Sequence, residues 1–183
     1  MAKITQLMKS KPYFPEVWPG EHYKLLGALT QVLQPKLVIE IGTASGLSAL
    51  AIKENLPQEG RLITFDILPW KNFWDTVLKD SDFKEGKIEQ ILGDLSKSEV
   101  FQKYQHLFQE ADLIFSDAPK DGYFEQQLMD QMLQITLPKK PLLVFDDIRL
   151  WEMLSIWRNI TFPKMDITSF GHWSGTGIVD WQG

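Results

Sequence analysis

Short apolar runs alternate with helix-like patterns along most of the chain. Runs rich in β-branched residues predict five strands, over 37–42, 61–67, 87–94, 111–117 and 141–147. Apolar residues recur at helical spacing over 45–56, 71–80, 99–109, 124–137 and 150–159. A helix over 21–33 precedes the first strand, and two strands over 165–170 and 175–181 end the chain.

This order of elements predicts the fold class. Strands that alternate with helices form parallel sheets with right-handed crossovers. The last two strands are joined only by residues 171–174, a link too short for a crossover, so they predict an antiparallel hairpin. We therefore expect a three-layer α/β fold around a seven-stranded sheet whose last strand is antiparallel.

Length and composition narrow the class further. The 183 residues suit one domain over 1–183, in which residues 1–20 form an irregular leader interrupted by three prolines. No apolar run approaches the roughly 18 residues of a membrane helix, and the N-terminus lacks the apolar core of a signal peptide. We therefore expect a cytoplasmic protein with no membrane partner. The absence of Cys excludes disulfides and thiolate chemistry, and the net charge of −5 disfavours nucleic acid as a partner.

The first strand runs into a turn bracketed by Gly42 and Gly46. Glycine lets a ligand approach the backbone, and the N-terminus of the next helix offers N–H groups to an anion. The turn is not the dinucleotide pattern G-x-G-x-x-G, because residue 44 is Ala44. Nor is it the hydrolase pattern G-x-S-x-G, because Ser45 comes one position late. An ordinary tight turn is the alternative.

Acidic residues mark the carboxyl ends of the other predicted parallel strands, where open α/β sheets bind their ligands. They are Asp66 after the second strand, Asp94 after the third, Asp117 after the fourth, and Asp146 and Asp147 after the fifth. Such a repeated placement is hard to explain as solvated loop ends, so these residues are candidates for a binding site.

Together these motifs resemble the class I S-adenosylmethionine (SAM)-dependent methyltransferases. The matching segments are LVIEIGTASGLSALAI, RLITFDI, ILGDL, ADLIFSDAPKDGY and LLVFDDIRLW, and the resemblance covers about residues 20–183. The chain is most similar to the O-methyltransferases of the caffeoyl-CoA, catechol and macrolide-sugar type. The resemblance implies a Rossmann-like sheet with strand order 3-2-1-4-5-7-6.

The resemblance also implies which residues hold SAM. Those expected around its methionine part are Glu40, Gly42, Thr43, Ala44 and Gly46, with Ser48 near its carboxylate. Asp66 would accept hydrogen bonds from the ribose, and Asp94 from the adenine amino group. Asp117 would border the cofactor and take part in catalysis.

The family pattern further implies a divalent cation and a base. Asp117, Asp146 and Asp147 match the positions that bind the cation in the metal-dependent members, and Lys120 matches a lysine proposed there as the general base. Carboxylates without His or Cys suit a hard ion such as Mg²⁺ or Ca²⁺. The cation would lower the pKa of a substrate hydroxyl, and Lys120 would take its proton if the pKa of Lys120 falls.

Two departures from the family pattern leave metal dependence open. The usual Asp-Ala-Asp-Lys is here Asp117-Ala118-Pro119-Lys120, and the usual Asp-Asn is here Asp146-Asp147. Plainer alternatives exist for three features: helix capping for Asp66 and for Asp146-Asp147, and a solvated loop cation paired with Asp117 or Asp121 for Lys120.

The sequence as a whole predicts SAM-dependent methyl transfer to a hydroxyl of a small molecule. The alternatives are a non-catalytic scaffold, a metal-free methyltransferase acting on another atom, and a nucleotide-dependent oxidoreductase. Candidates for an acceptor pocket, or for sealing the edge of the core, are His172, Trp173, Tyr13, Phe14 and Trp18. Oligomeric state stays open, although relatives of this type are often homodimers.

Overall fold

The computed structural model of the chain describes residues 21–84, 86–150, 152–169 and 173–181. One sheet contains β1 (Leu37–Ile41), β2 (Arg61–Asp66), β3 (Ile88–Leu92), β4 (Leu113–Ser116), β5 (Leu142–Asp146), β6 (Lys164–Asp166) and β7 (Thr176–Asp180). The spatial order is β3-β2-β1-β4-β5-β7-β6, and β7 is antiparallel to both of its neighbours. The other neighbouring strands pair in parallel. The predicted fold class and strand order are confirmed.

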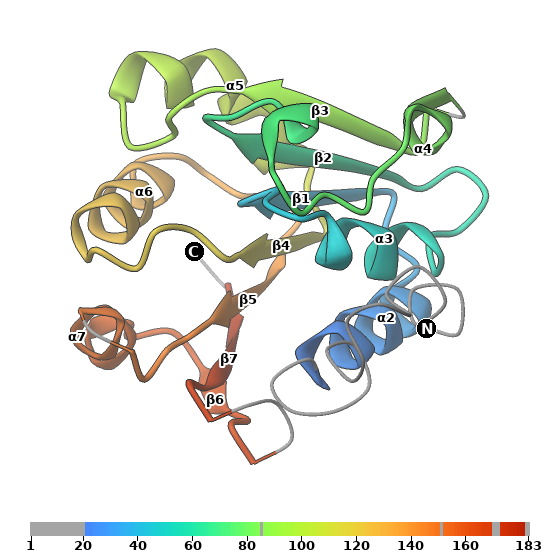
Figure 1. The fold of residues 1–183 in the computed structure, drawn as a ribbon. Helices are drawn as coiled ribbons and strands as arrows, with labels where there is room; N and C mark the ends of the chain where they lie inside the picture. The colour runs from blue at the N-terminus through green and yellow to red at the C-terminus, as the bar shows by residue number, and fades with distance from the viewer. Residues whose placement is uncertain (1–20, 85, 151, 170–172, 182–183) are drawn as a thin grey trace.

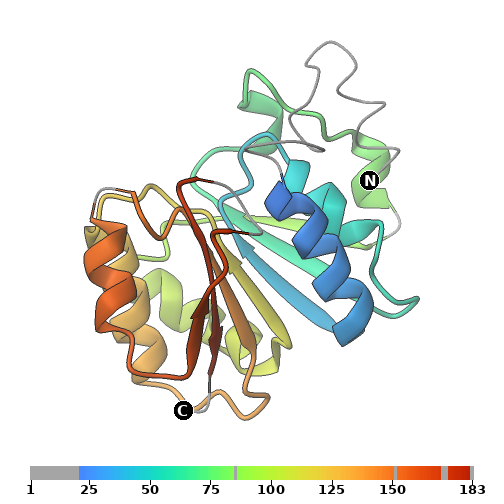
Figure 2. The same cartoon turned by 90° about the horizontal axis from the view of Figure 1, so that it is seen from below.

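Helices cover both faces of this sheet (Figures 1 and 2). α2 (Glu21–Leu33) and α3 (Leu47–Lys53) lie on one face. On the other face lie α5 (Ser98–Glu110), α6 (Tyr123–Leu133) and α7 (Met153–Asn159), while the short α4 (Asp80–Lys84) contacts β3. None of the helices in the described ranges is both long enough and apolar enough to cross a membrane.

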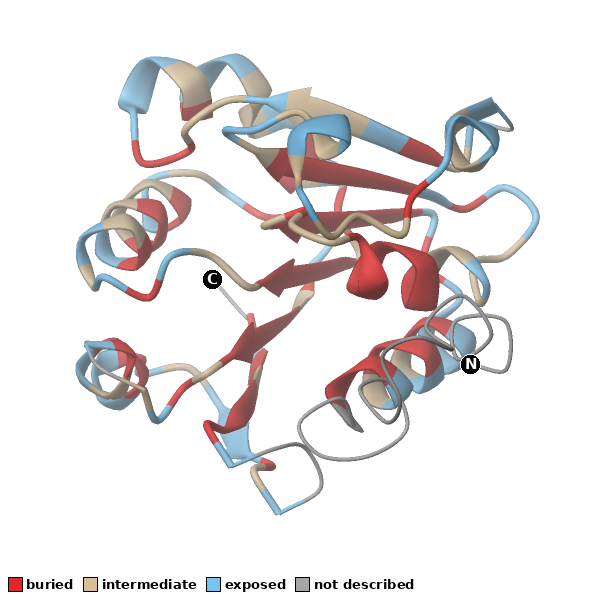
Figure 3. Cartoon of the chain, in the orientation of Figure 1, coloured by how far each residue is buried: buried red, intermediate tan, exposed pale blue. Residues whose placement is uncertain are grey.

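The protein has two hydrophobic cores, one on each face of the sheet, because successive side chains of a strand point to opposite faces. β1 is buried along its whole length (Figure 3), as expected for a parallel strand covered on both faces. Ile39 and Ile41 belong to the core under α5, α6 and α7, whereas Val38 belongs to the core under α2 and α3. Val144 of β5 lies in this second core, so Asp146, two positions further along β5, also faces α2.

The segment after β2 differs from the helix predicted over 71–80. It contains one 3-10 turn (Trp70–Asn72) and an irregular stretch before α4 begins. The N–H of Val77 donates to the carbonyl of Ser45 at 2.9 Å, and Leu78 is buried next to Gly46. These contacts tie the segment to the β1–α3 loop and outweigh its weak local preference for a helix.

Several other elements are shorter than predicted. The helix expected over 45–56 begins only at Leu47, because Gly46 has a left-handed conformation. The helix expected over 124–137 ends at Leu133, and the one expected over 150–159 begins at Met153. The strand expected over 165–170 covers Lys164–Asp166, and its last expected residue, like part of the 171–174 link, lies outside the described residues.

The buried face of α2 also differs from its apolar pattern. Val32 and Leu33 fit the helical spacing but are exposed, whereas the polar residues His22 and Thr30 are buried. Leu26 lies between these two at the same four-residue spacing and is fully buried. The helix therefore presents a partly polar face to the sheet.

The ends of β1 and β4 approach each other closely at Gly42. Its φ is +101°, and a Cβ atom there would lie 2.2 Å from the carbonyl oxygen of Asp117. Gly46 has a φ of +84°, and its Cβ would lie 2.2 Å from Leu78 Cγ. Both glycines of the loop are therefore required by the packing of the chain itself, in addition to any ligand that they admit.

We expect Gly42→Ala to destabilise the fold more than Gly86→Ala does. Gly86 also has a positive φ, but nothing lies within 4 Å of its added Cβ. Gly86→Ala should cost about 1–2 kcal/mol from the left-handed backbone alone. Gly42→Ala should cost about 1–3 kcal/mol more, because β4 must move away. Urea unfolding followed by Trp fluorescence measures the loss of unfolding free energy in both variants. Equal losses would show that the contact with the Asp117 carbonyl adds no cost at Gly42.

Candidate active site

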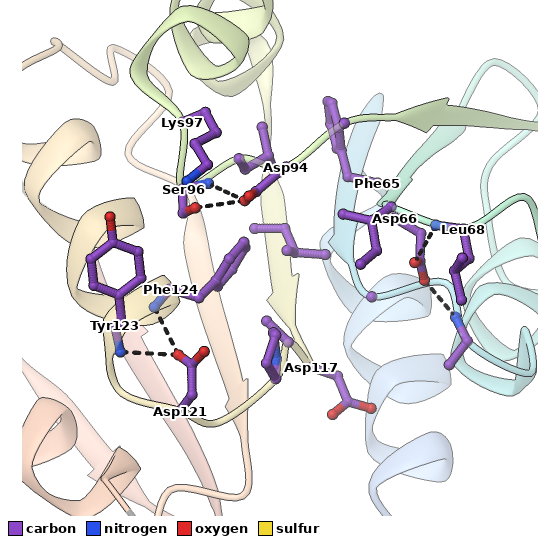
Figure 4. Close-up of a pocket in the computed structure, with 18 residues that line it drawn as sticks. Phe65, Asp66, Leu68, Asp94, Ser96, Lys97, Asp117, Asp121, Tyr123 and Phe124 are labelled. Carbon is purple, nitrogen blue, oxygen red and sulfur yellow. Dashed lines mark hydrogen bonds between the residues drawn. The ribbon is translucent and has the colours of Figure 1, made fainter.

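A pocket of about 470 Å³ opens beyond the carboxyl ends of β1 to β4 (Figure 4). Among the residues expected at SAM, those that line it are Gly42, Ala44, Asp66, Asp94 and Asp117. The other expected residues, which are buried and outside this lining, are Glu40, Thr43, Gly46 and Ser48. The pocket therefore lies at the predicted edge of the sheet, but only part of the predicted set faces it.

Asp66 holds the loop after β1 in place. Its Oδ2 accepts hydrogen bonds from the N–H groups of Thr43 at 3.0 Å and Ala44 at 3.1 Å. Its Oδ1 accepts one from the N–H of Leu68 at 3.0 Å (Figure 4). These bonds go to loops, so Asp66 does not cap a helix. A carboxylate accepts about four hydrogen bonds, so Asp66 retains about one acceptor position for a ligand.

Asp94 presents an acceptor on the other side of the pocket. Both hydrogen bonds that it accepts from Ser96, one from the N–H at 2.9 Å and one from the hydroxyl at 2.6 Å, go to Oδ1 (Figure 4). Phe65 and Phe124 add aromatic surface to the lining. The pocket therefore combines oriented carboxylates with apolar walls, as small-molecule sites commonly do.

Glu40 is completely buried next to this region. The hydroxyls of Ser48 and Thr64 lie near its carboxylate, but no well-formed hydrogen bond joins either of them to it. Burial raises the pKa of Glu40 from 4.5 to about 8, and although the hydroxyls of Ser48 and Thr64 oppose this rise, Asp117 adds to it. Glu40 is therefore mostly protonated at neutral pH.

Three carboxylates converge beyond the ends of β4 and β5. One oxygen from each of Asp117, Asp146 and Asp147 lies within 4.8 Å of the other two. The alternative that Asp146 and Asp147 cap the next helix is wrong, because α7 begins only at Met153. Asp147 instead has a left-handed backbone with a φ of 58°.

The surroundings of Asp147 shift the pKa of its carboxyl group upward. Burial raises its pKa, and the neighbouring carboxylate of Asp146 raises it further. A hydrogen bond to Ser174 and the ammonium of Lys120 oppose the rise but do not cancel it. Burial and like charge both disfavour the ionised form of a carboxylate, which explains the upward direction.

Lys120 lies inside this cluster and only 4% of it is exposed. Its Nζ donates to Asp117 Oδ1 at 2.5 Å and to the carbonyl of Ala118 at 2.8 Å, and lies 3.7 Å from Asp147 Oδ2. The alternative of a solvated cation is wrong, although the pairing with Asp117 is right. Burial lowers the pKa of Lys120, but the surrounding carboxylates outweigh burial and the net shift is upward. This direction is opposite to the fall that a general base requires.

Sequence reasoning missed Glu125, which shapes the loop that carries Lys120. Glu125 is buried, and its two carboxylate oxygens accept hydrogen bonds from the N–H groups of Lys120 at 2.9 Å and Gly122 at 3.0 Å. Lys120 takes a left-handed conformation there, with a φ of 68°. Gly122 is the N-cap of α6 and Glu125 is its third helical residue, so a Glu at this spacing, which can reach back to the N-cap N–H, was a usable signal.

Sequence reasoning also missed two residues of α2. His22 is buried, and its Nε2 lies 3.8 Å from Asp146 Oδ2. Tyr23 is buried beside it, and burial raises the pKa of its hydroxyl, with the charges of Asp117 and Asp146 adding to the rise. Nothing in the linear pattern signals that this helix covers the carboxylates. The aromatic candidates are less informative, since Trp173 is exposed and His172, Tyr13, Phe14 and Trp18 lie outside the described residues.

Residues 1–159 match the model of a protein family described as O-methyltransferase. The chain belongs to this O-methyltransferase family. The resemblance inferred from the motifs is thereby confirmed, and the matched range contains both the pocket and the three carboxylates.

Curated proteins from plants are similar to this family member. It is 28% identical to caffeoyl-CoA O-methyltransferase 2 of Zea mays over 146 residues, which are 75% of this chain and 52% of the relative. It is 30% identical to tricin synthase 1 of Oryza sativa subsp. japonica over 125 residues, 63% of this chain and 47% of the relative. The chain therefore spans about half the length of the curated relatives it matches.

Solved methyltransferases share the fold. An SAH-bound methyltransferase of Podospora anserina is 16% identical, with a TM-score of 0.66 over 100% of this chain and 87% of its own. An O-methyltransferase of Bacillus cereus in complex with SAH is 17% identical, with a TM-score of 0.65 over 97% of this chain and 88% of its own. At this identity the likeness is one of fold alone.

Glu40→Gln should make the protein relatively more stable as the pH rises. The folded pKa of about 8 lies above the ordinary value of 4.5, so between these values the unfolded chain binds fewer protons than the folded chain. The stability of the unchanged protein therefore falls as the pH rises through this window, and the amide, which does not titrate, avoids the loss. The difference in unfolding free energy should grow by at most about 1.4 kcal/mol per pH unit.

Urea unfolding at a series of pH values measures this difference. Glu89→Gln on β3 is the matched control, because Glu89 is exposed and its replacement should leave the pH dependence unchanged. Parallel curves for the unchanged protein and Glu40→Gln would contradict the prediction.

Proposed function

We propose that the chain transfers the methyl group of SAM to a hydroxyl oxygen of a small molecule, with a divalent cation held by Asp117, Asp146 and Asp147. Membership of the O-methyltransferase family supports transfer to oxygen. The names of the maize and rice relatives, a caffeoyl-CoA O-methyltransferase and a tricin synthase, support a small-molecule acceptor.

The observation that carries the proposal is the double position of Asp117. It lines the 470 Å³ pocket and also belongs to the three-carboxylate cluster. A ligand in the pocket and a cation in the cluster would therefore meet at one residue. Methyl transfer needs this proximity, because donor and acceptor atoms must be held within reach of each other.

The donor set of the pocket fits SAM. Asp66 retains about one acceptor position, which suits a ribose hydroxyl, and Asp94 Oδ2 takes none of the bonds from Ser96 and so suits the adenine amino group. The carboxylates around the pocket also favour a cofactor with a positive sulfonium. A pocket of this volume lies in the usual range for small-molecule sites.

The cluster likewise fits a divalent cation. Oxygen ligands of one cation lie about 2.0–2.6 Å from it, so their mutual separations do not exceed about 5 Å. The carboxylate oxygens of the cluster, within 4.8 Å of one another, meet this condition. A divalent cation bound there would lower the pKa of an acceptor hydroxyl and orient its oxygen.

The reaction forms a C–O bond to the methyl carbon while the C–S bond breaks, and the bonding electrons stay on the sulfur of the departing SAH. In this proposal Asp66 and the loop that it holds fix the cofactor, and Asp117 sets its distance from the acceptor. The hydroxyl proton needs an acceptor, and Lys120 remains our candidate. Lys120 must first release the proton with which it now binds Asp117 and Ala118.

Isothermal titration of the full chain with SAH, with and without Mg²⁺, tests the proposal. We expect SAH to bind in the micromolar range, and to bind more tightly with Mg²⁺ present. Binding that ignores Mg²⁺ would favour a metal-free methyltransferase, and no binding in either buffer would favour a non-catalytic scaffold.

Asp146→Asn should separate the cation from the cofactor. Asp146 is buried in the cluster but does not line the pocket, so SAH affinity should stay within about twofold. Mg²⁺ affinity should fall at least about tenfold, and methyl transfer to a test acceptor such as caffeoyl-CoA should fall with it. Titration calorimetry and a methyl-transfer assay measure these effects.

Asp130→Asn on α6 is the matched control and should change neither affinity, because Asp130 bonds only to Gln126 among the described hydrogen bonds. Equal loss of SAH and Mg²⁺ binding in Asp146→Asn would mean that Asp146 is structural.

The remaining expectations belong to the same proposal. We infer a single domain over residues 1–183, a cytoplasmic location and no nucleic-acid or membrane partner from the composition of the chain. The oligomeric state stays open, and sedimentation of the purified protein tests whether it forms a homodimer.

A further inference from the structure

The first turn of α2 brings an imidazole to the carboxylate cluster. His22 Nε2 lies 3.8 Å from Asp146 Oδ2, and the two side chains are only 6% and 5% exposed. His22 is not one of the residues that the family pattern implies for the cation. Its position offers a nitrogen ligand beside the carboxylate oxygens of the cluster.

The separation of the two atoms is compatible with a shared ion. Transition-metal ions lie about 2.0–2.2 Å from imidazole nitrogen and from carboxylate oxygen, so two ligand atoms of one ion are at most about 4.4 Å apart. The 3.8 Å between His22 Nε2 and Asp146 Oδ2 lies inside this limit. The cluster oxygens lie within 4.8 Å of one another, so the widest pair would have to draw together by about 0.4 Å around such an ion.

A second buried polar group lies beside Asp146. Thr176 of β7 is paired with Asp146 of β5 in the antiparallel register, so both side chains point to the same face of the sheet. Thr176 is fully buried, and its hydroxyl oxygen has no hydrogen-bond partner among residues 21–84, 86–150, 152–169 and 173–181. A buried hydroxyl without a partner is costly unless something absent from the protein chain satisfies it.

We propose that His22 supplies a nitrogen ligand to the cation held by Asp117, Asp146 and Asp147, so that the site selects a divalent transition-metal ion over Mg²⁺ and Ca²⁺. Imidazole suits ions such as Co²⁺, Ni²⁺ and Zn²⁺, whereas Mg²⁺ and Ca²⁺ take oxygen ligands. The inference rests on the cation site of the proposed function and not on methyl transfer itself.

Titration of the chelator-treated full chain with Co²⁺ or Mg²⁺ alone, without SAM, tests this inference. We expect the unchanged protein to bind Co²⁺ at least about tenfold more tightly than Mg²⁺. His22→Gln, which replaces the nitrogen by an amide of similar reach, should weaken Co²⁺ binding about tenfold or more and leave Mg²⁺ binding within about twofold. His106→Gln on α5 is the matched control, because His106 is exposed, and it should change neither affinity.

A measurement on the unchanged protein covers the case in which His22→Gln does not fold. A histidine bound to Co²⁺ gives a strongly shifted, exchangeable imidazole N–H proton in the NMR spectrum. We expect this signal in the Co²⁺ form and not in the Mg²⁺ form, and its absence from the Co²⁺ form would overturn the inference.

The other outcomes are equally decisive. If His22→Gln weakens Co²⁺ and Mg²⁺ binding equally, His22 merely orients Asp146 and the inference fails. It also fails if neither affinity changes, or if the unchanged protein binds neither ion. In that last case SAH binding still reports separately on the proposed function.

Discussion

The site depends on how closely β4 passes the end of β1. Gly42 has no side chain and a φ of +101°, which lets the Asp117 carbonyl occupy the space that a Cβ would need. The N–H of Asp117 donates to the carbonyl of Ile41 at 2.8 Å, and the N–H of Gly42 donates to that of Phe65 at 2.8 Å. These contacts fix the start of the Asp117 side chain between the pocket and the carboxylate cluster. A displacement of β4 would separate the two.

The second constraint is electrostatic. The fold gathers Asp117, Asp146 and Asp147 under α2 and provides Lys120 as the buried cation that partly balances them. The direction of each pKa shift follows from this balance. Burial and the nearby carboxylates raise the pKa of Asp147. The pKa of Lys120 is also raised, because the nearby carboxylates outweigh the lowering effect of burial. Such a cluster favours any positive partner that enters it. The same field disfavours the neutral lysine that a simple base mechanism needs.

The sequence predicted the sheet because strand periodicity and strand–helix alternation are local and repeated signals. It failed where long-range contacts decide the outcome. The segment before α4 is irregular because Val77 and Leu78 bind the β1–α3 loop, which no local pattern reveals. The candidate carboxylates were visible because they follow strands, but His22 and Tyr23 were not, because their role depends on where α2 packs. Which residues line the pocket was likewise decided by the conformation of the loop.

The two halves of the site therefore have different structural origins. The pocket is built from loops that follow β1 to β4, so its acceptor groups are tied to the sheet and to glycines that cannot change easily. The cover of the carboxylate cluster comes from α2, which precedes the sheet in the chain and contributes His22. Substitutions on this face of α2 can change the surroundings of Asp146 without moving the pocket. The properties of the cluster can then vary while the pocket stays the same, and Asp117 is the residue that belongs to both.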